Sequence, residues 1–246
     1  MDSNHNNDRT PSSRWSLRGK KFVVTGGTKG IGKAVVQSLL SHGAYRIVVC
    51  SRSDIDYEAY IASVGIDPAQ PSSRDTAGGT PVITHVTCDV STKEGRQKLV
   101  NISKDMLNED LGNDDSDPRC IHGLINNVGI NVRKPILEQT EEEYHSMLRT
   151  NVDAAYFLCR DFSKHFVDNG DGATIVNVSS AAGVQSSGTG AAYGMSKAAL
   201  NHFTRILACE WAHRSIRVNA VAPWMTVSII LVVLKQCWVS FFKYFD

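Results

Sequence analysis

The sequence predicts an α/β protein in which helices cover both faces of a doubly wound parallel sheet. Short β-branched runs alternate with helical patterns along most of the chain, the order in which crossover helices connect parallel strands. A glycine-rich turn joins the first of these strands to the first helix. The 246 residues are enough for one domain with a substantial core. We therefore expect three layers, α/β/α.

Composition narrows the class of protein. The 26 Lys and Arg residues nearly balance the 25 Asp and Glu residues, so no overall field favours nucleic acid as a partner. Six cysteines without a C-x-x-C pair predict reduced core thiols in a cytoplasmic protein, and eight histidines without H-E-x-x-H predict no metal site. Residues 1–14 are polar and lack the apolar core of a signal peptide, so we expect a disordered N-terminal tail.

The first strand begins at Lys21 and leads into the pattern T-G-x-x-x-G-x-G. Gly26 would allow the tight exit from the strand, Gly30 the close approach of a pyrophosphate, and Gly32 the packing of the helix on the sheet. The free N–H groups of that helix favour phosphate. The pattern predicts a dinucleotide site, and a purely structural turn is the alternative.

The second strand, RIVVCSR, ends at Ser51 and Arg52. A carboxylate at this place would bind the ribose hydroxyls of NAD, whereas an arginine accommodates the 2′-phosphate of NADP. Lys29 in the glycine-rich turn adds a second cation on the same side. These residues predict NADP(H) as the cofactor, and two solvated surface charges are the alternative.

Two further strands complete the first part of the chain. Residues 53–81 contain a short helical piece and a Pro/Gly/Ser-rich stretch, which we interpret as a surface insertion. The strand VITHVTCDV ends with Asp89 and Val90, which we expect at the adenine end of the cofactor. A helix and an acidic loop follow, and the strand CIHGLINN then ends at Asn126, Asn127, Val128 and Gly129. Asn and Gly at the end of a central strand suit a ligand crevice.

Helical spacing continues from about residue 140 to 167, with Asn151 in the middle. Because Asn is a mediocre helix former, we expect it to kink the helix and bind a water there. The strand ATIVNVSS, a helix to about Ala212 and the strand IRVNAVAP follow, which makes six strands.

Tyr193 and Lys197 lie four residues apart at the start of the last helix. Residues with this spacing share one helix face, and an ammonium beside a phenol stabilises the phenolate. A serine hydroxyl from the preceding strand end, Ser179 or Ser180, could hold a substrate oxygen there. The constellation predicts proton transfer at an oxygen, although such a pair alone is also common on solvated helix faces.

Together, TGGTKGIG, NNVG, Asn151, the Ser179–Ser180 strand end with YGMSK, and RVNAVAP resemble the short-chain dehydrogenase/reductase family. RWSLRGKKFVVTGG, CSR and LACEWAHRSIRVNAVAP are similar to its tropinone-reductase-like plant branch. The resemblance covers about residues 15–226 and implies a Rossmann-type NADP(H)-binding domain of that extent. The family's Asn-Asn-Ala-Gly is Asn-Asn-Val-Gly here, an enlargement that we expect to be tolerated.

The resemblance also implies roles for single residues. A serine thirteen positions before the tyrosine is catalytic in the family, which selects Ser180 over Ser179. Tyr193 is then the general acid/base, Lys197 assists it and holds the nicotinamide ribose, and Asn151 maintains a water-linked proton relay. The implied cofactor-binding residues are Gly26, Thr28, Lys29, Gly30, Ile31, Gly32, Ser51, Arg52, Asp89, Val90, Asn127, Val128, Gly129, Tyr193, Lys197 and Pro223.

The implied activity is NADP(H)-dependent interconversion of a ketone and a secondary alcohol, with reduction as the working direction. The partner is a small-molecule carbonyl or alcohol substrate, with neither nucleic acid nor membrane. Tropane alkaloids, terpenoid alcohols and small cyclic ketones all remain open as substrates. The helices at 140–167 and 193–212 are expected to form a homodimer.

After Pro223 the sequence departs from the family, which has a substrate lid and a seventh strand there. We interpret residues 227–246 as an atypical apolar tail of a truncated or mis-spliced chain, with six family strands and the seventh missing. The apolar run Val227–Leu234 is too short to cross a bilayer. Two hypotheses follow: an active oxidoreductase, or a catalytically impaired chain that at best binds the nucleotide.

Overall fold

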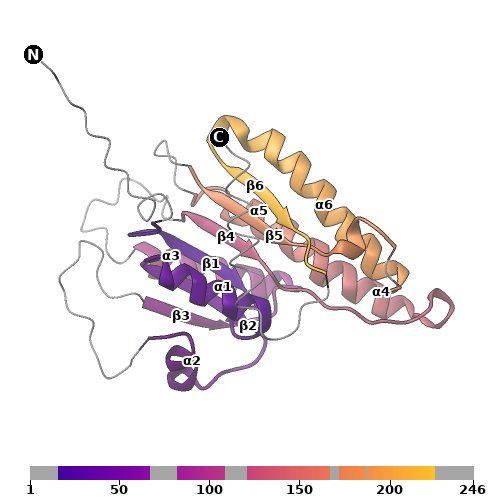
Figure 1. Cartoon of the computed structure of the whole chain (residues 1–246), viewed down its shortest axis with the longest axis horizontal. Helices are drawn as coiled ribbons and strands as arrows, with labels where there is room; N and C mark the ends of the chain where they lie inside the picture. The colour runs from indigo at the N-terminus through magenta and orange to yellow at the C-terminus, as the bar shows by residue number, and fades with distance from the viewer. Residues whose placement is uncertain (1–15, 67–81, 109–120, 167–171, 187, 225–246) are drawn as a thin grey trace, which may run out of the picture.

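The structure, a computed structural model, describes residues 16–66, 82–108, 121–166, 172–186 and 188–224. The strands in these ranges form one sheet of six, all parallel, in the order β3-β2-β1-β4-β5-β6 (Figure 1). They are β1 (Lys21–Thr25), β2 (Arg46–Ser51), β3 (Val82–Thr87), β4 (Gly123–Asn126), β5 (Thr174–Val178) and β6 (Arg217–Val221). The doubly wound α/β fold predicted from the sequence is confirmed.

Several expectations concern segments outside the described residues. These are the N-terminal tail at 1–14, the Pro/Gly/Ser-rich part of the insertion, the acidic loop before β4, and the tail at 227–246 with the expected loss of a seventh strand. In the described part of the chain, no helix is both long and apolar enough to cross a membrane.

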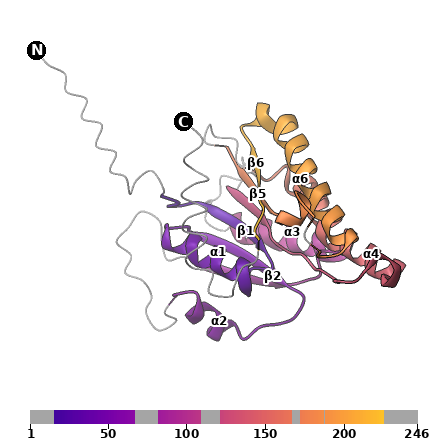
Figure 2. The same cartoon turned by 45° about the vertical axis from the view of Figure 1, so that its right-hand side comes forward.

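The central strands β2, β1, β4 and β5 are buried on both faces of the sheet, as their apolar sequences require. All five residues of β1 are buried, and their side chains alternate between two cores. Val23 packs into the core under helices α3 (Lys93–Asn108), α5 (Ala154–Phe162) and α6 (Ala191–Trp211). Val24 packs into the core under α1 (Gly30–Ser41) and α2 (Tyr57–Ser63). The two views in Figures 1 and 2 show these helices on either side of the strands.

The long helix expected from 140 to 167 is divided into three parts. Helix α4 (Glu141–Leu148) begins with a capping box in which Thr140 and Glu143 satisfy each other's backbone N–H groups. A π-helical turn, η2 (Arg149–Asp153), follows and leads into α5. Helix α5 ends at Phe162, earlier than predicted, because a turn begins at Ser163. The expected irregularity at Asn151 is thus a widened helical turn.

The described cysteines only partly match the expectation of core thiols. Cys50, Cys88 and Cys159 are buried, but Cys209 is exposed. Cys209 follows the buried Leu207 by two residues, about 200° around helix α6, so its side chain faces away from the sheet. The prediction of a buried thiol was therefore wrong for Cys209.

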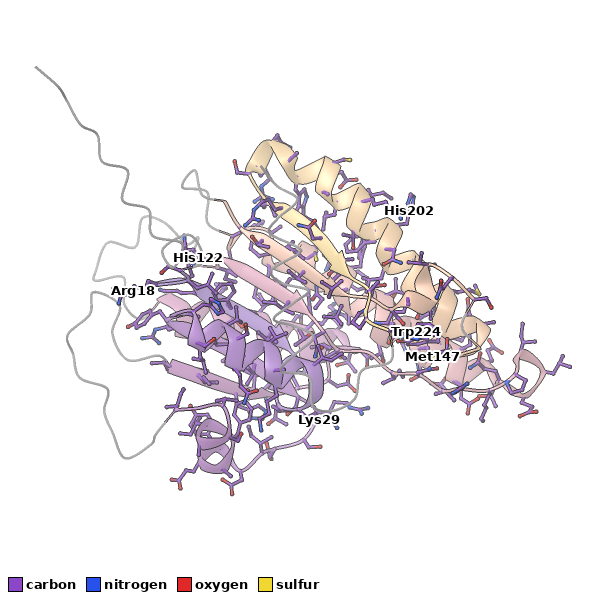
Figure 3. All side chains as sticks on the ribbon, viewed as in Figure 1. Arg18, Lys29, His122, Met147, His202 and Trp224 are labelled. Atoms are coloured by element: carbon purple, nitrogen blue, oxygen red, sulfur yellow. The ribbon has the colours of Figure 1, made fainter. Side chains whose placement is uncertain are left out.

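The amino ends and the carboxyl ends of the parallel strands lie at opposite edges of the sheet. Arg18 and His122 precede β1 and β4 and lie at the amino-terminal edge, whereas Lys29 and Trp224 follow β1 and β6 and lie at the opposite edge (Figure 3). Chain connections leave the adjacent strands β1 and β4 in opposite directions. In such sheets the ligand crevice opens beyond the carboxyl ends of the two strands at this switch point.

Candidate active site

The glycine-rich turn between β1 and α1 depends on its glycines for backbone shape and for space. Gly26 and Gly30 have φ angles of +65° and +54°. A Cβ on Gly32 would lie 2.2 Å from the Gly26 carbonyl oxygen and 2.6 Å from Asn127 Nδ2, so only glycine fits there. Lys29 precedes the first turn of α1 without capping it through its side chain. The first N–H groups of α1 are therefore available to an anion.

Polar contacts fix this turn to the end of β4. Thr25 Oγ1 accepts hydrogen bonds from the backbone N–H groups of Asn127 (2.9 Å) and Val128 (3.1 Å). The Asn127 side-chain amide donates to the Thr25 and Gly26 carbonyl oxygens at 2.9 and 3.2 Å. The structure therefore assigns the Asn127 side chain to supporting the turn. A buried tyrosine that sequence reasoning missed, Tyr60 of α2, adds a hydrogen bond to the Gly27 carbonyl oxygen at 2.9 Å.

Thr28 and Ile31 of the same turn are both half-buried. Ile31 packs against the core beneath α1 and α2, so its side chain anchors the start of the helix. Val128, the residue that replaces the smaller family residue, is also half-buried and packs against the core on the opposite face.

Asn151 is buried by the π-helical turn and forms a polar junction. Its side-chain amide donates to the Ile130 carbonyl oxygen and to Ser196 Oγ, each at 2.9 Å, and its Oδ1 accepts from the Ile130 N–H at 2.8 Å. Ser196, which sequence reasoning missed, donates in turn to the Tyr193 carbonyl oxygen at 2.7 Å. The junction therefore joins the segment after β4 to the first turn of α6. Ser196 lies within the motif YGMSK, but sequence reasoning gave it no role.

Lys197 reaches the same place from α6. Its side chain is 3% exposed, and its Nζ donates to the Val178 carbonyl oxygen at 2.8 Å and lies 5.9 Å from the centre of the Tyr193 ring. A Cβ on Gly129 would lie 3.2 Å from Lys197 Nζ and 3.3 Å from Asn151 Oδ1. The structure thus places Lys197 and Asn151 both next to Gly129, with the Tyr193 ring beside Lys197.

Burial lowers the pKa of Lys197 from its ordinary value to about 8. Between about pH 8 and pH 10.5 the unfolded chain therefore binds more protons at Lys197 than the folded chain does. The burial of Lys197 thus costs the folded chain less as the pH rises through this interval.

We expect the difference in free energy of unfolding between the wild-type chain and a Lys197→Met chain to stay constant below pH 8. From pH 8 to pH 10.5 this difference should rise in favour of the wild type. Urea unfolding at several pH values measures it. A level difference throughout would mean that Lys197 titrates normally.

The two serines at the end of β5 have different environments. Ser179 is buried, and its hydroxyl donates to the Lys197 carbonyl oxygen at 3.2 Å, so it ties β5 to α6. Ser180 is less buried, and its Oγ accepts from the Ala182 N–H at 3.2 Å at the start of the short turn η3 (Ala181–Gly183). That turn packs directly on α6, since a Cβ on Gly183 would lie 2.6 Å from the Lys197 carbonyl carbon.

Pro223 follows β6 and contacts this turn. Its carbonyl oxygen accepts a hydrogen bond from the Ala181 N–H at 3.0 Å. The short turn η3 is therefore held from two sides, by α6 at Gly183 and by the end of β6 at Ala181.

The two cations expected to select the cofactor follow different strands: Lys29 lies in the turn between β1 and α1, and Arg52 directly follows β2. Lys29 and Arg52 are exposed, and neither forms an ion pair with a residue that the structure describes. The Ser51 hydroxyl lies 2.8 Å from the Ser53 carbonyl oxygen and 2.8 Å from His85 Nε2. Asp54, a carboxylate in the same loop, accepts a hydrogen bond from Thr87 Oγ1.

The segment after β3 folds back on itself. Asp89 Oδ1 accepts from the Ser91 N–H at 2.9 Å, and Val90 is buried. The Val90 carbonyl oxygen accepts from Arg96 Nη1 at 3.0 Å. A contact of Asp89 or Val90 with adenine stays a prediction.

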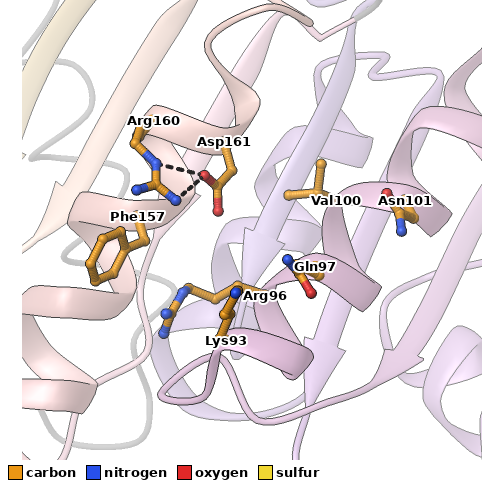
Figure 4. Close-up of a pocket in the computed structure, with 8 residues that line it drawn as sticks. All are labelled: Lys93, Arg96, Gln97, Val100, Asn101, Phe157, Arg160 and Asp161. Atoms are coloured by element: carbon orange, nitrogen blue, oxygen red, sulfur yellow. Dashed lines mark hydrogen bonds and ion pairs between the residues drawn. The ribbon is translucent and has the colours of Figure 1, made fainter.

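A cavity of about 360 Å³ lies between α3 and α5, and none of the site residues proposed from the sequence lines it. Its lining is Lys93, Arg96, Gln97, Val100, Asn101, Phe157, Arg160 and Asp161 (Figure 4). The guanidinium carbons of Arg96 and Arg160 lie 4.6 and 4.8 Å from the centre of the Phe157 ring, and Arg160 also pairs with Asp161 at 2.7 Å. Because both guanidinium groups contact protein groups, we do not assign the active site to this cavity.

Comparisons with known proteins agree with this geometry. Residues 20–234 match the family model described as short chain dehydrogenase. A tropinone reductase homologue of Arabidopsis thaliana is 38% identical over 224 residues, 91% of this chain and 76% of that protein. A tropinone reductase homologue of Datura stramonium is 39% identical over 212 residues, 86% of this chain and 70% of that protein. The structure of a short-chain dehydrogenase/reductase from Serratia marcescens superposes with a TM-score of 0.67 at 28% identity, covering 84% of this chain and 74% of that one.

Proposed function

The chain belongs to the short-chain dehydrogenase family, in its tropinone-reductase-like plant branch, and on this premise we propose that it interconverts a ketone and a secondary alcohol with NADP(H). The family consists of oxidoreductases that use nicotinamide nucleotides. The observation that carries the proposal is the buried Lys197 ammonium beside the Tyr193 ring, one helical turn apart and next to Asn151.

The chain offers a fitting place for a dinucleotide. The glycine-rich turn has two positive φ angles, the start of α1 is not capped by a side chain, and Gly129 leaves room in front of Lys197. The pyrophosphate would bind to the N–H groups of this turn, and the nicotinamide end would lie toward Tyr193. When bound, NADP(H) supplies the hydride.

The protein's own part is the proton and the orientation of the substrate oxygen. In reduction Tyr193 donates a proton to the carbonyl oxygen, and in oxidation it accepts that proton. Ser180 donates a hydrogen bond to the same oxygen and holds it beside the phenol. The Lys197 ammonium stabilises the phenolate that forms when the proton has left. Asn151 fixes the backbone of Ile130 against α6, which supports the relative positions of these groups.

We propose NADP(H) over NAD(H) because the loops after β1 and β2 each carry a cation, Lys29 and Arg52, that forms no ion pair with the described residues. Arg52 can donate two parallel hydrogen bonds to a phosphate, and Lys29 supplies a second positive charge. Asp54 is engaged by Thr87, so its carboxylate already has a partner within the loop.

An Arg52→Ala chain is expected to lose about 10- to 100-fold in kcat/KM for NADPH, because a hydrogen bond to a charged group contributes about 1.5–3 kcal/mol. Its kcat/KM for NADH should stay at the wild-type value, since NADH lacks the 2′-phosphate. Steady-state kinetics with both nucleotides and one ketone measure this. Arg18→Ala, at an exposed arginine at the opposite edge of the sheet (Figure 3), is the matched control. Equal losses with both nucleotides would contradict the assignment.

The reaction itself is tested by following NADPH absorbance with a panel of cyclic ketones and tropane ketones. We expect oxidation of NADPH that depends on the ketone and reverses with the corresponding alcohol and NADP⁺. Binding of NADPH, measured by its fluorescence, without turnover of any ketone would support the alternative function, a chain that binds the nucleotide only.

We also propose that the chain forms a homodimer through α4–α5 and α6. Tyr156 and Ile206 leave 50% and 45% of their surfaces exposed on these helices, and the Tyr156 ring lies 5.4 Å from that of Phe203. Exposed apolar side chains on neighbouring helices favour an interface. Light scattering after gel filtration measures the mass in solution.

A further inference from the structure

The Ser51 hydroxyl has two hydrogen-bond contacts, one with its own loop and one with the neighbouring strand. Ser51 is the last residue of β2, and His85 lies on β3 at the edge of the sheet. In the strand register Ser51 is opposite Thr87, two residues beyond His85, so the Ser51 and His85 side chains lie on the same face. Ser51 Oγ is 2.8 Å from the Ser53 carbonyl oxygen and 2.8 Å from His85 Nε2.

Counting hydrogens assigns the donors. A hydroxyl has a single hydrogen and two acceptor positions, and the Ser53 carbonyl oxygen can only accept. The Ser51 hydrogen therefore goes to Ser53, and His85 donates its Nε2–H to Ser51 Oγ. Burial lowers the pKa of His85 although the Asp54 carboxylate opposes this, so at neutral pH the ring is uncharged and carries one N–H. That N–H is used on Ser51.

The arrangement holds the serine oxygen in place and leaves its hydrogen able to turn. If the hydroxyl hydrogen rotates from the Ser53 carbonyl oxygen to a phosphate oxygen, the His85 N–H still fixes Ser51 Oγ. A donor that is already in position binds an anion without a further cost of ordering the side chain. Arg52, the adjacent residue, is exposed and can reach the same phosphate.

We propose that His85 is a positioning residue for the 2′-phosphate of NADP(H), acting through its hydrogen bond to the Ser51 hydroxyl. The inference rests on the proposed use of NADP(H) and extends it to a residue within the edge strand β3, to which sequence reasoning gave no role. Because His85 acts through Ser51, removing its N–H should weaken the binding of nucleotides that carry the 2′-phosphate and no others.

The test is titration of the chain with NADPH and with NADH, followed by nucleotide fluorescence, for the wild type and for His85→Phe and His85→Leu. Both variants lack the N–H, and Phe keeps a ring of similar size. We expect the dissociation constant for NADPH to rise about 5- to 10-fold, the size of one hydrogen bond, with no change for NADH. His85→Gln, which restores an N–H donor, should recover most of the affinity. In a Ser51→Ala chain, His85→Phe should have no further effect.

Thr84→Ala is the matched control, because Thr84 lies on the same strand but faces the other side of the sheet. Thermal unfolding of each variant separates a loss of folding from a loss of binding. The inference would be overturned if the His85 variants bound NADPH and NADH more weakly by the same factor. It would also be overturned if His85→Phe weakened NADPH binding equally in the wild-type and the Ser51→Ala chains. If Arg52→Ala abolishes the preference for NADPH but neither His85 variant changes it, this inference alone fails. A wild-type chain that binds both nucleotides alike would overturn the proposed use of NADP(H), and this inference with it.

Discussion

Replacement of Tyr193 by Phe is expected to lower kcat for ketone reduction by about a thousandfold, the scale of general acid catalysis at one proton. Lys197 Nζ lies 5.9 Å from the centre of the ring, which Phe keeps. The Tyr193 hydroxyl forms no hydrogen bond to any of the residues that the structure describes, so its removal breaks no internal contact there. Folding and NADPH binding should therefore stay as in the wild type.

Single-turnover absorbance with saturating NADPH measures the chemical step, and fluorescence titration measures binding. Tyr45→Phe is the matched control, since this tyrosine is half-buried just before β2, at the opposite edge of the sheet from the proposed site. A Tyr193→Phe chain that reduces ketones at the wild-type rate would mean that another group supplies the proton.

Replacement of Gly32 by Ala is expected to abolish measurable nucleotide binding and to lower the free energy of unfolding by about 1–3 kcal/mol. The added Cβ would lie 2.2 Å from the Gly26 carbonyl oxygen, so backbone must move. That movement would also break the hydrogen bonds of Asn127 to Thr25 and Gly26, which give the turn its shape. Urea unfolding and NADPH titration measure the two effects.

A Gly30→Ala chain distinguishes the steric effect of an added Cβ from the effect of an unfavourable φ angle in the same turn. No atom lies within 4 Å of a Cβ placed there, and only the φ angle of +54° is unfavourable. Its cost should be about 1–2 kcal/mol of left-handed strain at most, with the turn preserved. If Gly32→Ala were as stable as the wild type and bound NADPH normally, the close packing of α1 on the turn would not be needed for binding.

The fold followed from the sequence because parallel strands need apolar residues on both faces. Strands such as β1, in which every residue is buried, carry consecutive apolar residues, and each is separated from the next by a helix or a turn with glycine. The predicted ends of the helices were less accurate than their order along the chain. The helix predicted to 167 ends at Phe162, because helical spacing alone does not mark where a turn begins.

Residues of the candidate site could be predicted from the sequence where they belong to a motif or lie at the end of a strand. Tyr193 and Lys197 share a helix face by spacing alone, and the turn at Asn151 followed from poor helix propensity. Ser196 and His85 could not be predicted, because their roles depend on partners 45 and 34 residues away in the chain. The hydrogen bonds that occupy Asn127 likewise depend on how β4 lies beside β1.

The central claim is that the Tyr193 phenol, the Lys197 ammonium and the Ser180 hydroxyl converge beside a nicotinamide held by the glycine-rich turn. A crystal structure of the chain with NADP⁺ measures this directly. We expect the pyrophosphate on the N–H groups between Gly26 and Gly32, Lys197 Nζ bonded to the nicotinamide ribose, and the Tyr193 and Ser180 oxygens both facing the nicotinamide. NADP⁺ bound elsewhere, or bound with the Tyr193 oxygen turned away from the nicotinamide and from Ser180, would contradict the account.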